Sequence, residues 1–295
     1  MLRPFAIHQP MTVSEATSLM RDYGDAAAFY AGGTELLIVL KEHLAVVDHL
    51  IDLKRIPGLD EISLQDDGAS LKIGALATHR AIERSVLVQR RLPVLAALEA
   101  KVANVRVRAA GTLGGNLCFA DPHSDPATLL SALGATLTLD NGTAQRNVRA
   151  DAFTTDLMTT DREPDEVLTH ITVPLPGANV GTGYERIKLH ERPTVSAAAV
   201  ITVADNLIAA ARLYLGCIGD APQRLRDVED VLVGLPALVT SGERVKPLIA
   251  SLALTYDTPF ESARYKRQLA SAVGVRAIAA AVANAVHPQG SRHAV

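Results

Sequence analysis

The sequence has few residues that could hold an inorganic redox centre. Only two cysteines, Cys118 and Cys217, occur in 295 residues, and they are far apart. Neither belongs to a C-x-x-C pair, which excludes a disulfide framework and leaves too few thiolates for a protein-ligated iron–sulfur cluster. Any redox cofactor of this chain must therefore be organic, and held noncovalently or attached in some other way.

The chain also lacks an excess of positive charge. Its formal net charge is −3 and its pI is about 6.3, so no broad cationic surface is available for nucleic-acid phosphates or anionic lipid. No apolar run reaches the roughly 18 residues of a membrane span, and MLRPFAIHQP does not resemble a secretory leader. We therefore expect a cytoplasmic protein that binds no nucleic acid and has no membrane span.

Familiar catalytic motifs are missing as well. The sequence contains neither H-E-x-x-H nor a Gly-x-Ser-x-Gly elbow, so nothing supports metal-dependent or serine-dependent hydrolysis. It also contains neither the G-x-G-x-x-G dinucleotide motif nor a P-loop. A nucleotide, if one is bound, must be held in another way.

The apolar pattern of the first half predicts alternating elements. Residues 26–30 read as a buried strand, 35–44 as an amphipathic helix and 46–53 as the next strand, which makes a β-α-β unit. Residues 62–76 read as an antiparallel hairpin turning at Asp67-Gly68. Further on we predict helices within 78–101, a turn-rich segment over 108–126, a helix near 127–133, a strand at 136–139, and more sheet through Val173.

A cluster of prolines and glycines marks a boundary in the chain. Five of them fall within ten residues, at Pro174, Pro176, Gly177, Gly181 and Gly183. The last third then predicts strands within 184–189, 196–203 and 210–219, and a final helix within 261–286 that packs on a small sheet.

Two glycine-rich turns are the strongest candidates for binding. They are AGGTE, from Ala31 to Glu35, and GTLGGN, from Gly111 to Asn116. A diphosphate needs several backbone N–H donors at close range, which only glycine permits without a Cβ in the way. We expect Thr34 to begin a helix and to offer its N–H group and hydroxyl at the positive end of the dipole. A lone Gly-Gly turn is more often a packing device, and two turns of similar make-up are more suggestive of nucleotide binding than one, although their spacing alone leaves the packing role open.

In order and spacing, four segments resemble the FAD-binding subunit of the xanthine dehydrogenase and carbon monoxide dehydrogenase family. They are AGGTELLIVLK, TLGGNLCFADPHSDP, DEVLTHITVPLP and ARYKRQLASAVGVRAI. The resemblance spans nearly the whole chain and implies an α+β fold with a vanillyl-alcohol-oxidase-type FAD-binding domain of two subdomains. These would be residues 1–57 and 58–177, followed by a small C-terminal α+β domain over 178–288 and a tail over 289–295.

The same resemblance implies a function. The chain would bind FAD and pass electrons from the iron–sulfur clusters of a partner subunit to an external acceptor. The implied partners are a molybdopterin-binding large subunit, which oxidises the substrate, and a small subunit with 2Fe–2S clusters, together in a dimer of heterotrimers. The substrate stays open, as does the acceptor: NAD, a quinone or another carrier. A self-sufficient flavin oxidoreductase of this fold and a cofactor-free scaffold subunit are the alternatives.

The resemblance also implies binding residues. The first turn would supply one pyrophosphate loop, formed by Ala31, Gly32, Gly33, Thr34 and Glu35. The second turn would supply the other, formed by Thr112, Leu113, Gly114, Gly115 and Asn116.

Four residues outside the turns complete the implied site. Asp125 matches an acidic position that contacts the FAD chain by hydrogen bonding, and its alternative role is a helix cap. Leu168 matches an apolar residue placed against the isoalloxazine ring, or is simply a core leucine. Lys188 and Tyr184 fall near the segment beside the flavin, or are solvated strand residues.

The sequence departs from relatives in two places. Pro193 and Thr194 stand where relatives of the carbon monoxide dehydrogenase kind have an acidic and an aromatic residue, so the ring's stacking partner stays open. The cysteine-rich insertion of relatives that reduce aromatic acyl-CoA substrates is missing. His79 and His123 are possible flavin neighbours, although scattered histidines are more often surface or capping residues, and Cys118 is typical of a small buried hydrophobe.

Overall fold

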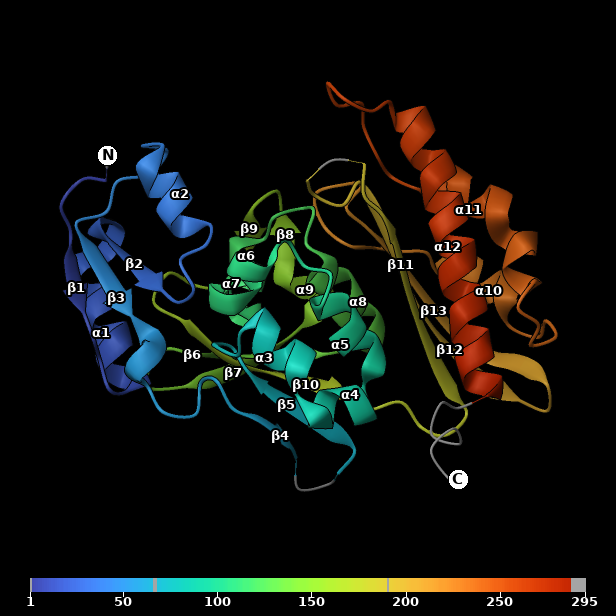
Figure 1. Ribbon diagram of the computed structural model, residues 1–295, viewed down its shortest axis with the longest axis horizontal. Helices are drawn as coiled ribbons and strands as arrows, with labels where there is room; N and C mark the ends of the chain where they lie inside the picture. Colours follow the sequence, from blue (N-terminus) through green and yellow to red (C-terminus); the bar gives the residue numbers. More distant parts are fainter. Residues whose placement is uncertain (1, 66–67, 190, 288–295) are drawn as a thin grey trace. The chain divides into compact units, whose positions relative to one another are not determined.

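The structure, a computed structural model, describes residues 2–65, 68–189 and 191–287 (Figure 1). The predicted tail and Asp67 of the predicted hairpin turn lie outside these residues. The described residues form two compact units: the first contains residues 2–65, 68–120, 135–155 and 159–174, and the second contains residues 121–134, 156–158, 175–189 and 191–287. Both mix helices with sheet, which confirms the predicted α+β class.

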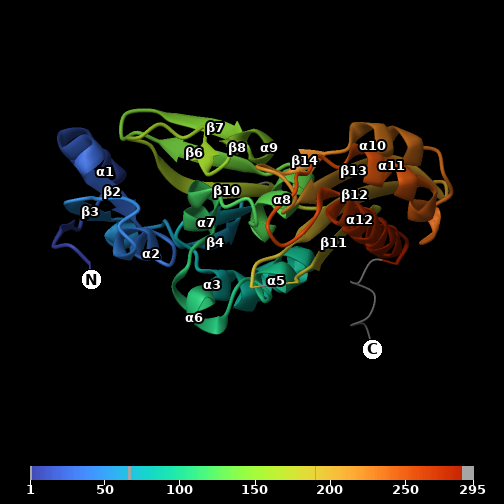
Figure 2. The same ribbon diagram turned by 90° about the horizontal axis from the view of Figure 1, so that it is seen from above.

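The first unit begins with a small parallel sheet. Its strands are β1 (Ala6–His8), β2 (Ala27–Tyr30) and β3 (His49–Asp52), in the order β1-β3-β2. Helix α1 (Val13–Tyr23) leads from β1 to β2, and α2 (Leu36–Lys41) leads from β2 to β3. Because parallel crossovers are right-handed and these two run in opposite directions, the helices lie on opposite faces of the sheet (Figure 2). The predicted β-α-β unit is confirmed, and β1 and α1 extend it.

A five-stranded antiparallel sheet follows in the first unit, in the order β4-β5-β10-β6-β7. Strands β4 and β5 form the predicted antiparallel hairpin, and β10 lies at the centre of the sheet. The strands are β4 (Ile62–Leu64), β5 (Ser70–Gly74), β6 (Thr136–Asp140), β7 (Gln145–Arg149) and β10 (Val167–Pro174). Beside them lie α9 (Ala150–Phe153) and a short pair, β8 (Thr154–Asp156) and β9 (Thr159–Thr160).

Short helices gather on one face of this sheet (Figure 2). Three of them fall within the predicted 78–101 segment: α3 (His79–Arg84), α4 (Val86–Arg91) and α5 (Pro93–Glu99). Ser85 caps α4 through its hydroxyl and Pro93 begins α5, so each helix stops where the next one starts.

The turn-rich prediction for 108–126 was wrong over much of its length. Helix α6 (Val105–Ala110) ends within this segment and α7 (Leu113–Phe119) is contained in it. Thr112 caps α7 by accepting a hydrogen bond from the N–H group of Gly115. Gly114 is required inside α7 because the helix packs closely on the chain at Ala75, where a Cβ on Gly114 would lie 2.5 Å from that of Ala75.

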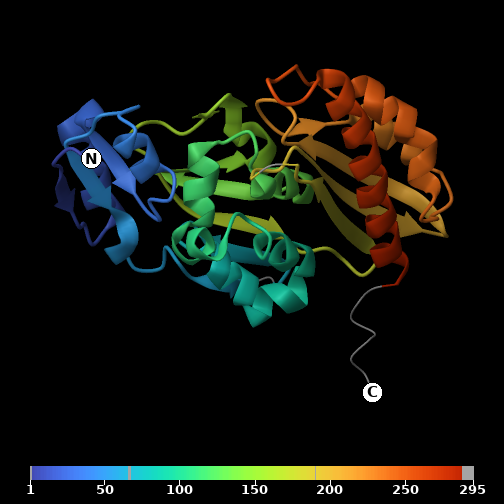
Figure 3. The same ribbon diagram turned by 45° about the horizontal axis from the view of Figure 1, so that its top comes forward.

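The second unit contains a four-stranded antiparallel sheet in the order β11-β12-β13-β14. Its strands are β11 (Val180–Ile187), β12 (Val195–Ala204), β13 (Leu207–Gly216) and β14 (Gln223–Arg224). Figure 3 shows α12 (Ala263–Val286) running along this sheet, with α10 (Arg226–Leu232) and α11 (Lys246–Leu252) beside it. Alanine, valine, leucine and isoleucine side chains form the core between the sheet and α12. The three predicted strands overlap β11, β12 and β13, and the predicted final helix overlaps α12, so these predictions are confirmed.

Helix α12 is long and apolar enough, by length and composition alone, to cross a membrane, although the buried core helix of a globular protein passes the same test. Its apolar window is 56% buried, and it packs against β11 and β12. Its hydropathy is therefore explained by burial in the core of the second unit.

Helix α8 (Asp125–Leu133) groups with the second unit, although its sequence position lies within the proposed 58–177 subdomain. Eight of its nine residues are buried, and it packs on β12 and β13. A helix with nearly all of its residues buried needs other elements to pack against, and β12 and β13 are such elements for α8.

Candidate functional site

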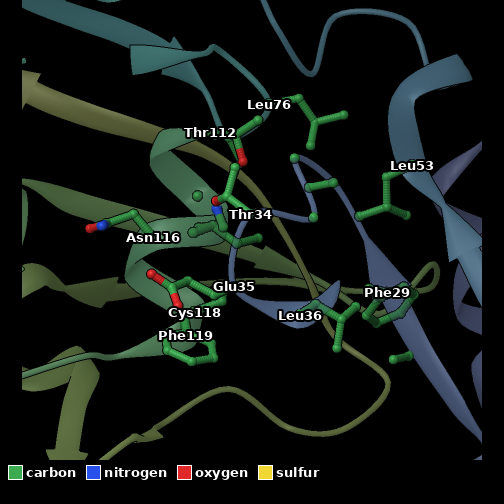
Figure 4. Close-up of a pocket in the computed structure, with 18 of the residues that line it drawn as sticks. Phe29, Thr34, Glu35, Leu36, Leu53, Leu76, Thr112, Asn116, Cys118 and Phe119 are labelled. Carbon is green, nitrogen blue, oxygen red and sulfur yellow. The ribbon is translucent and has the colours of Figure 1, made fainter. Parts of the chain in front are cut away.

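A cavity of about 720 Å³ lies within the first unit. This size suits a ligand larger than a single ring system. Figure 4 shows part of its lining, which includes residues from β2 and the turn after it, the residue after β3, the residues after β5, and α7. The wall of the cavity therefore joins the parallel sheet to the antiparallel one.

The parallel sheet places its strand ends at this cavity. Phe29 lies on β2, Ala31 directly follows β2, and Leu53 directly follows β3; all three line the cavity. Carboxyl ends of neighbouring parallel strands meet at one edge of a sheet, which is where α/β folds bind ligands. Phe29, Leu53 and Leu76 were not predicted, because an apolar residue at a strand end has no distinguishing sequence signal.

The two glycine turns lie against each other at this edge. A Cβ on Gly32 would lie 2.2 Å from the carbonyl oxygen of Ala110 and 2.8 Å from the Cα of Gly111. Gly32 is therefore required by the close approach of the two backbones. Figure 4 shows Thr34 of the first turn beside Thr112 of the second. Segments about eighty residues apart thus form one wall.

Local contacts hold the first turn in place. Gly33 has φ of +70°, a conformation that favours glycine, and its α-carbon faces the ring of Tyr30. Lys54 lies over the same ring, 4.1 Å from its centroid, and its ammonium donates to the carbonyl oxygen of Ala31 at 3.4 Å.

The first turn presents unpaired backbone donors. In the described part of the chain, the N–H groups of Gly32, Gly33 and Thr34 donate to no protein acceptor, and neither does that of Leu36. All four residues line the cavity. Consecutive N–H groups of this kind form an anion-binding concavity.

The second turn differs from the expectation of free glycine amides. The N–H group of Leu113 donates to Ala77, that of Gly114 to Ala75, and that of Asn116 to the Thr112 carbonyl. The N–H group of Gly115 donates to the Thr112 hydroxyl at 3.1 Å. These donors stabilise α7, so the second turn offers a ligand its side chains and the N–H group of Thr112, which donates to no acceptor among the described residues. Because the Thr112 hydroxyl accepts from Gly115, its own proton remains available for donation.

The helix after the first turn begins later than predicted. Thr34 and Glu35 form a turn, and α2 begins at Leu36 with Glu35 as its N-cap. Thr34 therefore precedes the helix, and its hydroxyl lies 3.3 Å from the position that a Cβ on Gly111 would occupy. The side chain thus points to the junction of the two turns.

Most of the predicted residues of the first unit line the cavity, and one does not. The lining includes Ala31, Gly32, Gly33, Thr34, Glu35, Thr112, Gly114, Gly115, Asn116 and Leu168. Leu113 is absent from the lining and 0% exposed. Since its side chain is in the core, it anchors α7.

Asp125 and Lys188 lie in the second unit. Asp125 is 4% exposed, accepts a hydrogen bond from the Tyr184 hydroxyl and forms an ion pair with Arg186. Burial, with the negative charge of Asp125, raises the pKa of Tyr184 well above its usual value. The suggested cap role of Asp125 was wrong, because Ser124 accepts from the Ala127 N–H group at 3.4 Å and caps α8. Lys188 is exposed, just after β11.

The two arginines of the cavity wall are held by protein acceptors. Arg21 donates to the Asn141 carbonyl and to Asp165, each within 3.1 Å. Arg162 donates to three carbonyl oxygens between Glu163 and Glu166, the longest at 3.1 Å. Beside it, burial raises the pKa of the Cys118 thiol to about 11, against the opposing charge of Arg162. Cys118 therefore stays a neutral thiol near pH 7.

The two histidines singled out by sequence occupy different settings. His79 is 2% exposed, lines the cavity and pairs with Glu99. His123 lies in the second unit with its ring against Asp121. Burial, with the nearby charge of Lys266, lowers the pKa of His123. Among the described residues, no group of three or more His, Cys, Asp or Glu side chains is arranged to hold a metal ion.

Comparison with known proteins matches both parts of the chain. The family of the FAD binding domain in molybdopterin dehydrogenase matches residues 3–176. The family of the CO dehydrogenase flavoprotein C-terminal domain matches residues 187–281.

Individual relatives match over most of their length. The carbon monoxide dehydrogenase medium chain of Afipia carboxidovorans is 29% identical over 283 residues, which cover 95% of this chain and 98% of that protein. That of Hydrogenophaga pseudoflava is 34% identical over 224 residues, which cover 75% of this chain and 77% of that protein. The structure of quinoline 2-oxidoreductase from Pseudomonas putida 86 matches with a TM-score of 0.91 and 27% identity, covering 97% of this chain and 100% of the matched chain.

Proposed function

Because this chain belongs to the family of FAD-binding medium subunits of molybdenum hydroxylases, we propose that it relays electrons from the iron–sulfur clusters of a partner subunit, through FAD, to an external acceptor. One observation supports the FAD site most directly. Two distant glycine turns meet at a cavity of about 720 Å³, where four neighbouring N–H groups have no acceptor among the described residues. FAD, when bound, supplies chemistry that accepts electrons singly and releases them in pairs.

The donor set fits the diphosphate of FAD. The N–H groups of the first turn offer several donors to anionic oxygens, and the hydroxyls of Thr34 and Thr112 add side-chain donors. Leu168 lines the same cavity, which suits our proposal that it lies against the isoalloxazine ring. The protein residues bind and orient the cofactor.

Two further contacts are part of the proposal. We assign Asp125 to the FAD chain and Lys188 to the flavin region by family resemblance. The ion pair of Asp125 with Arg186 fixes its carboxylate, so any contact with FAD would use an oxygen that is already oriented. We also retain the division into subdomains 1–57 and 58–177, a C-terminal domain 178–288 and a tail 289–295.

Flavin content tests the cofactor assignment. The full chain is purified without added flavin, and its absorbance spectrum is recorded before and after titration with FAD. We expect a flavin spectrum that survives gel filtration. A colourless protein that takes up no FAD would support the scaffold alternative instead.

Assembly with partner subunits tests the relay. Relatives are named as medium chains of carbon monoxide dehydrogenase and as an FAD-binding subunit of xanthine dehydrogenase. We propose a molybdopterin-binding large subunit and a 2Fe–2S small subunit, in a dimer of heterotrimers in the cytoplasm. Affinity purification of the chain from its native host should recover two further chains together with molybdenum and iron. Full turnover by the isolated chain would favour the self-sufficient alternative.

A further inference from the structure

His79 and Glu99 form a buried pair at the wall of the cavity. His79 is the first residue of α3 and Glu99 the last of α5, and they are 2% and 0% exposed. The distance from Nδ1 of His79 to Oε2 of Glu99 is 2.5 Å, and Oε1 of Glu99 has no hydrogen-bond partner among the described residues. His79 lines the cavity, whereas Glu99 does not.

The burial of Glu99 limits where the protons lie. A hydrogen bond between Nδ1 and Oε2 permits an imidazolium with a carboxylate, a neutral imidazole with a protonated Glu99, or a neutral imidazole with a carboxylate. The third arrangement buries a net negative charge with one oxygen unsatisfied, which is costly. With the proton of a neutral Glu99 on Oε2, both net-neutral arrangements place a hydrogen on Nε2 of His79, whereas a proton on Oε1 would be left without an acceptor among the described residues.

His79 lines the cavity, and the Cδ2 edge of its ring lies at the junction of the two turns. Cδ2, the ring carbon bonded to Nε2, lies 3.2 Å from the position that a Cβ on Gly111 would occupy. The hydroxyl oxygen of Thr34 lies 3.3 Å from the same position. The backbone N–H group of His79 also donates to the Gly111 carbonyl at 3.1 Å, which holds the first residue of α3 beside the second turn.

A diphosphate in the cavity would need hydrogen-bond donors beside the second turn. The lining of the cavity includes no lysine among the described residues, and each of its two arginines is held in place by protein acceptors through Nη1. The amides of Leu113, Gly114, Gly115 and Asn116 are paired within the protein, whereas that of Thr112 donates to no acceptor among the described residues. On the side of the second turn, a diphosphate would therefore find the N–H group of Thr112 and side-chain donors, and among these the ring of His79 is buried and held by Glu99.

We propose that Nε2 of His79, oriented by Glu99, donates a hydrogen bond to a phosphate oxygen of the bound dinucleotide. His79 is then a binding residue in addition to the two turns. This inference rests on the proposed FAD function. It assigns His79 to the diphosphate and not to the flavin ring, and this distinction can be measured.

Two substitutions separate the two ring nitrogens. In His79→Asn, the side-chain amide can reach Glu99 as Nδ1 does, but the donor at Nε2 is lost. In His79→Gln, the terminal amide extends toward the place of Nε2. Affinities of the full chain for FAD, ADP and riboflavin are measured by calorimetry. We expect His79→Asn to weaken FAD and ADP binding by about 10-fold or more, because a hydrogen bond to a charged group is lost. Riboflavin, which has no phosphate, should bind as to the wild type, and His79→Gln should recover part of the loss.

The control is His170→Asn, which changes a partly buried histidine on β10 that does not line the cavity. It should leave all three affinities unchanged. If the wild type and His79→Asn bind FAD with equal affinity, the inference is wrong and the proposed function still stands. The same holds if His79→Asn loses affinity equally for FAD, ADP and riboflavin. A wild-type chain that binds no FAD would overturn both. Nitrogen-15 NMR of the wild type needs no variant: an Nε2 that carries no hydrogen would also refute the inference.

Discussion

At the residue scale, the glycines of the two turns serve different contacts. Gly32 lies where two backbones touch, and Gly114 lies where α7 packs on Ala75. Gly115 is more open, since an added Cβ would meet the Thr112 hydroxyl at 2.8 Å and the Cβ of Ala31 only at 4.0 Å. Gly115 is therefore the best position at which to add bulk toward the cavity.

We predict that Gly115→Val weakens FAD binding by about 10-fold or more, because the branched side chain displaces the Thr112 hydroxyl and fills space between the turns. Titration by flavin fluorescence measures the change. Gly177→Val is the control, because its added Cβ would meet no atom closer than 3.9 Å. Unchanged affinity in Gly115→Val would show that the ligand lies elsewhere.

Cys118 provides a pH-dependent prediction. Its pKa is raised to about 11 by burial, and alkylation requires the thiolate. At pH 8 we expect alkylation about 100-fold slower than for a cysteine thiol with its ordinary pKa of 9.0, and the rate should rise with pH until about 11. Mass spectrometry after iodoacetamide treatment gives the rate, and Cys118→Ser identifies the modified site. FAD should slow the reaction further because Cys118 lines the cavity.

At the element scale, the side chain of Thr112 caps the N-terminus of α7. Thr112→Val removes the hydroxyl that accepts from the Gly115 N–H group. We predict a loss of about 1 kcal/mol in the free energy of unfolding, together with weaker FAD binding. Urea denaturation and FAD titration check the two effects. Ser85→Ala removes the cap of α4 and does not touch the cavity lining, so it should reduce stability without changing FAD affinity.

Helix α8 is held through Asp125. Because its carboxylate pairs with Arg186 and accepts from Tyr184 in a buried setting, Asp125→Asn should cost about 3 kcal/mol of unfolding free energy. Chemical denaturation of the full chain measures this. Asp151→Asn breaks a more exposed pair with Arg149 and should cost under about 1 kcal/mol. Similar costs for both variants would mean that the Asp125 cluster contributes no more than a surface pair.

At the scale of the whole molecule, ligand binding and stability are linked. FAD at 100 times its dissociation constant should raise the free energy of unfolding by about 2.7 kcal/mol, if the unfolded chain does not bind it. A thermal shift assay at increasing FAD concentration measures the effect. Gly115→Val at the same FAD concentrations should show a smaller shift. No shift in the wild type would mean that the folded chain does not bind FAD under these conditions.

Much of the architecture was predictable because it depends on local pattern. The spacing of apolar residues predicted β2, α2 and β3, the strands of the second unit, and the last helix, since periodicity reports which face of an element is buried. The same reasoning missed α7, because glycines and polar residues read as a turn unless the packing on Ala75 is known. It also predicted that the last helix packs on a small sheet, and the contacts of α12 with β11 and β12 explain its apolar character.

The sequence by itself determined the α+β class, the family and the two glycine turns, because motifs and periodicity are properties of neighbouring residues. Only the tertiary structure decided which donors the turns present. The N–H groups of Gly114 and Gly115 are paired within the protein, whereas in the described part of the chain those of Gly32 and Gly33 are not. It also decided that Glu99 lies against His79. A donor is available only if no distant part of the chain accepts from it, and folding alone brings those distant parts together.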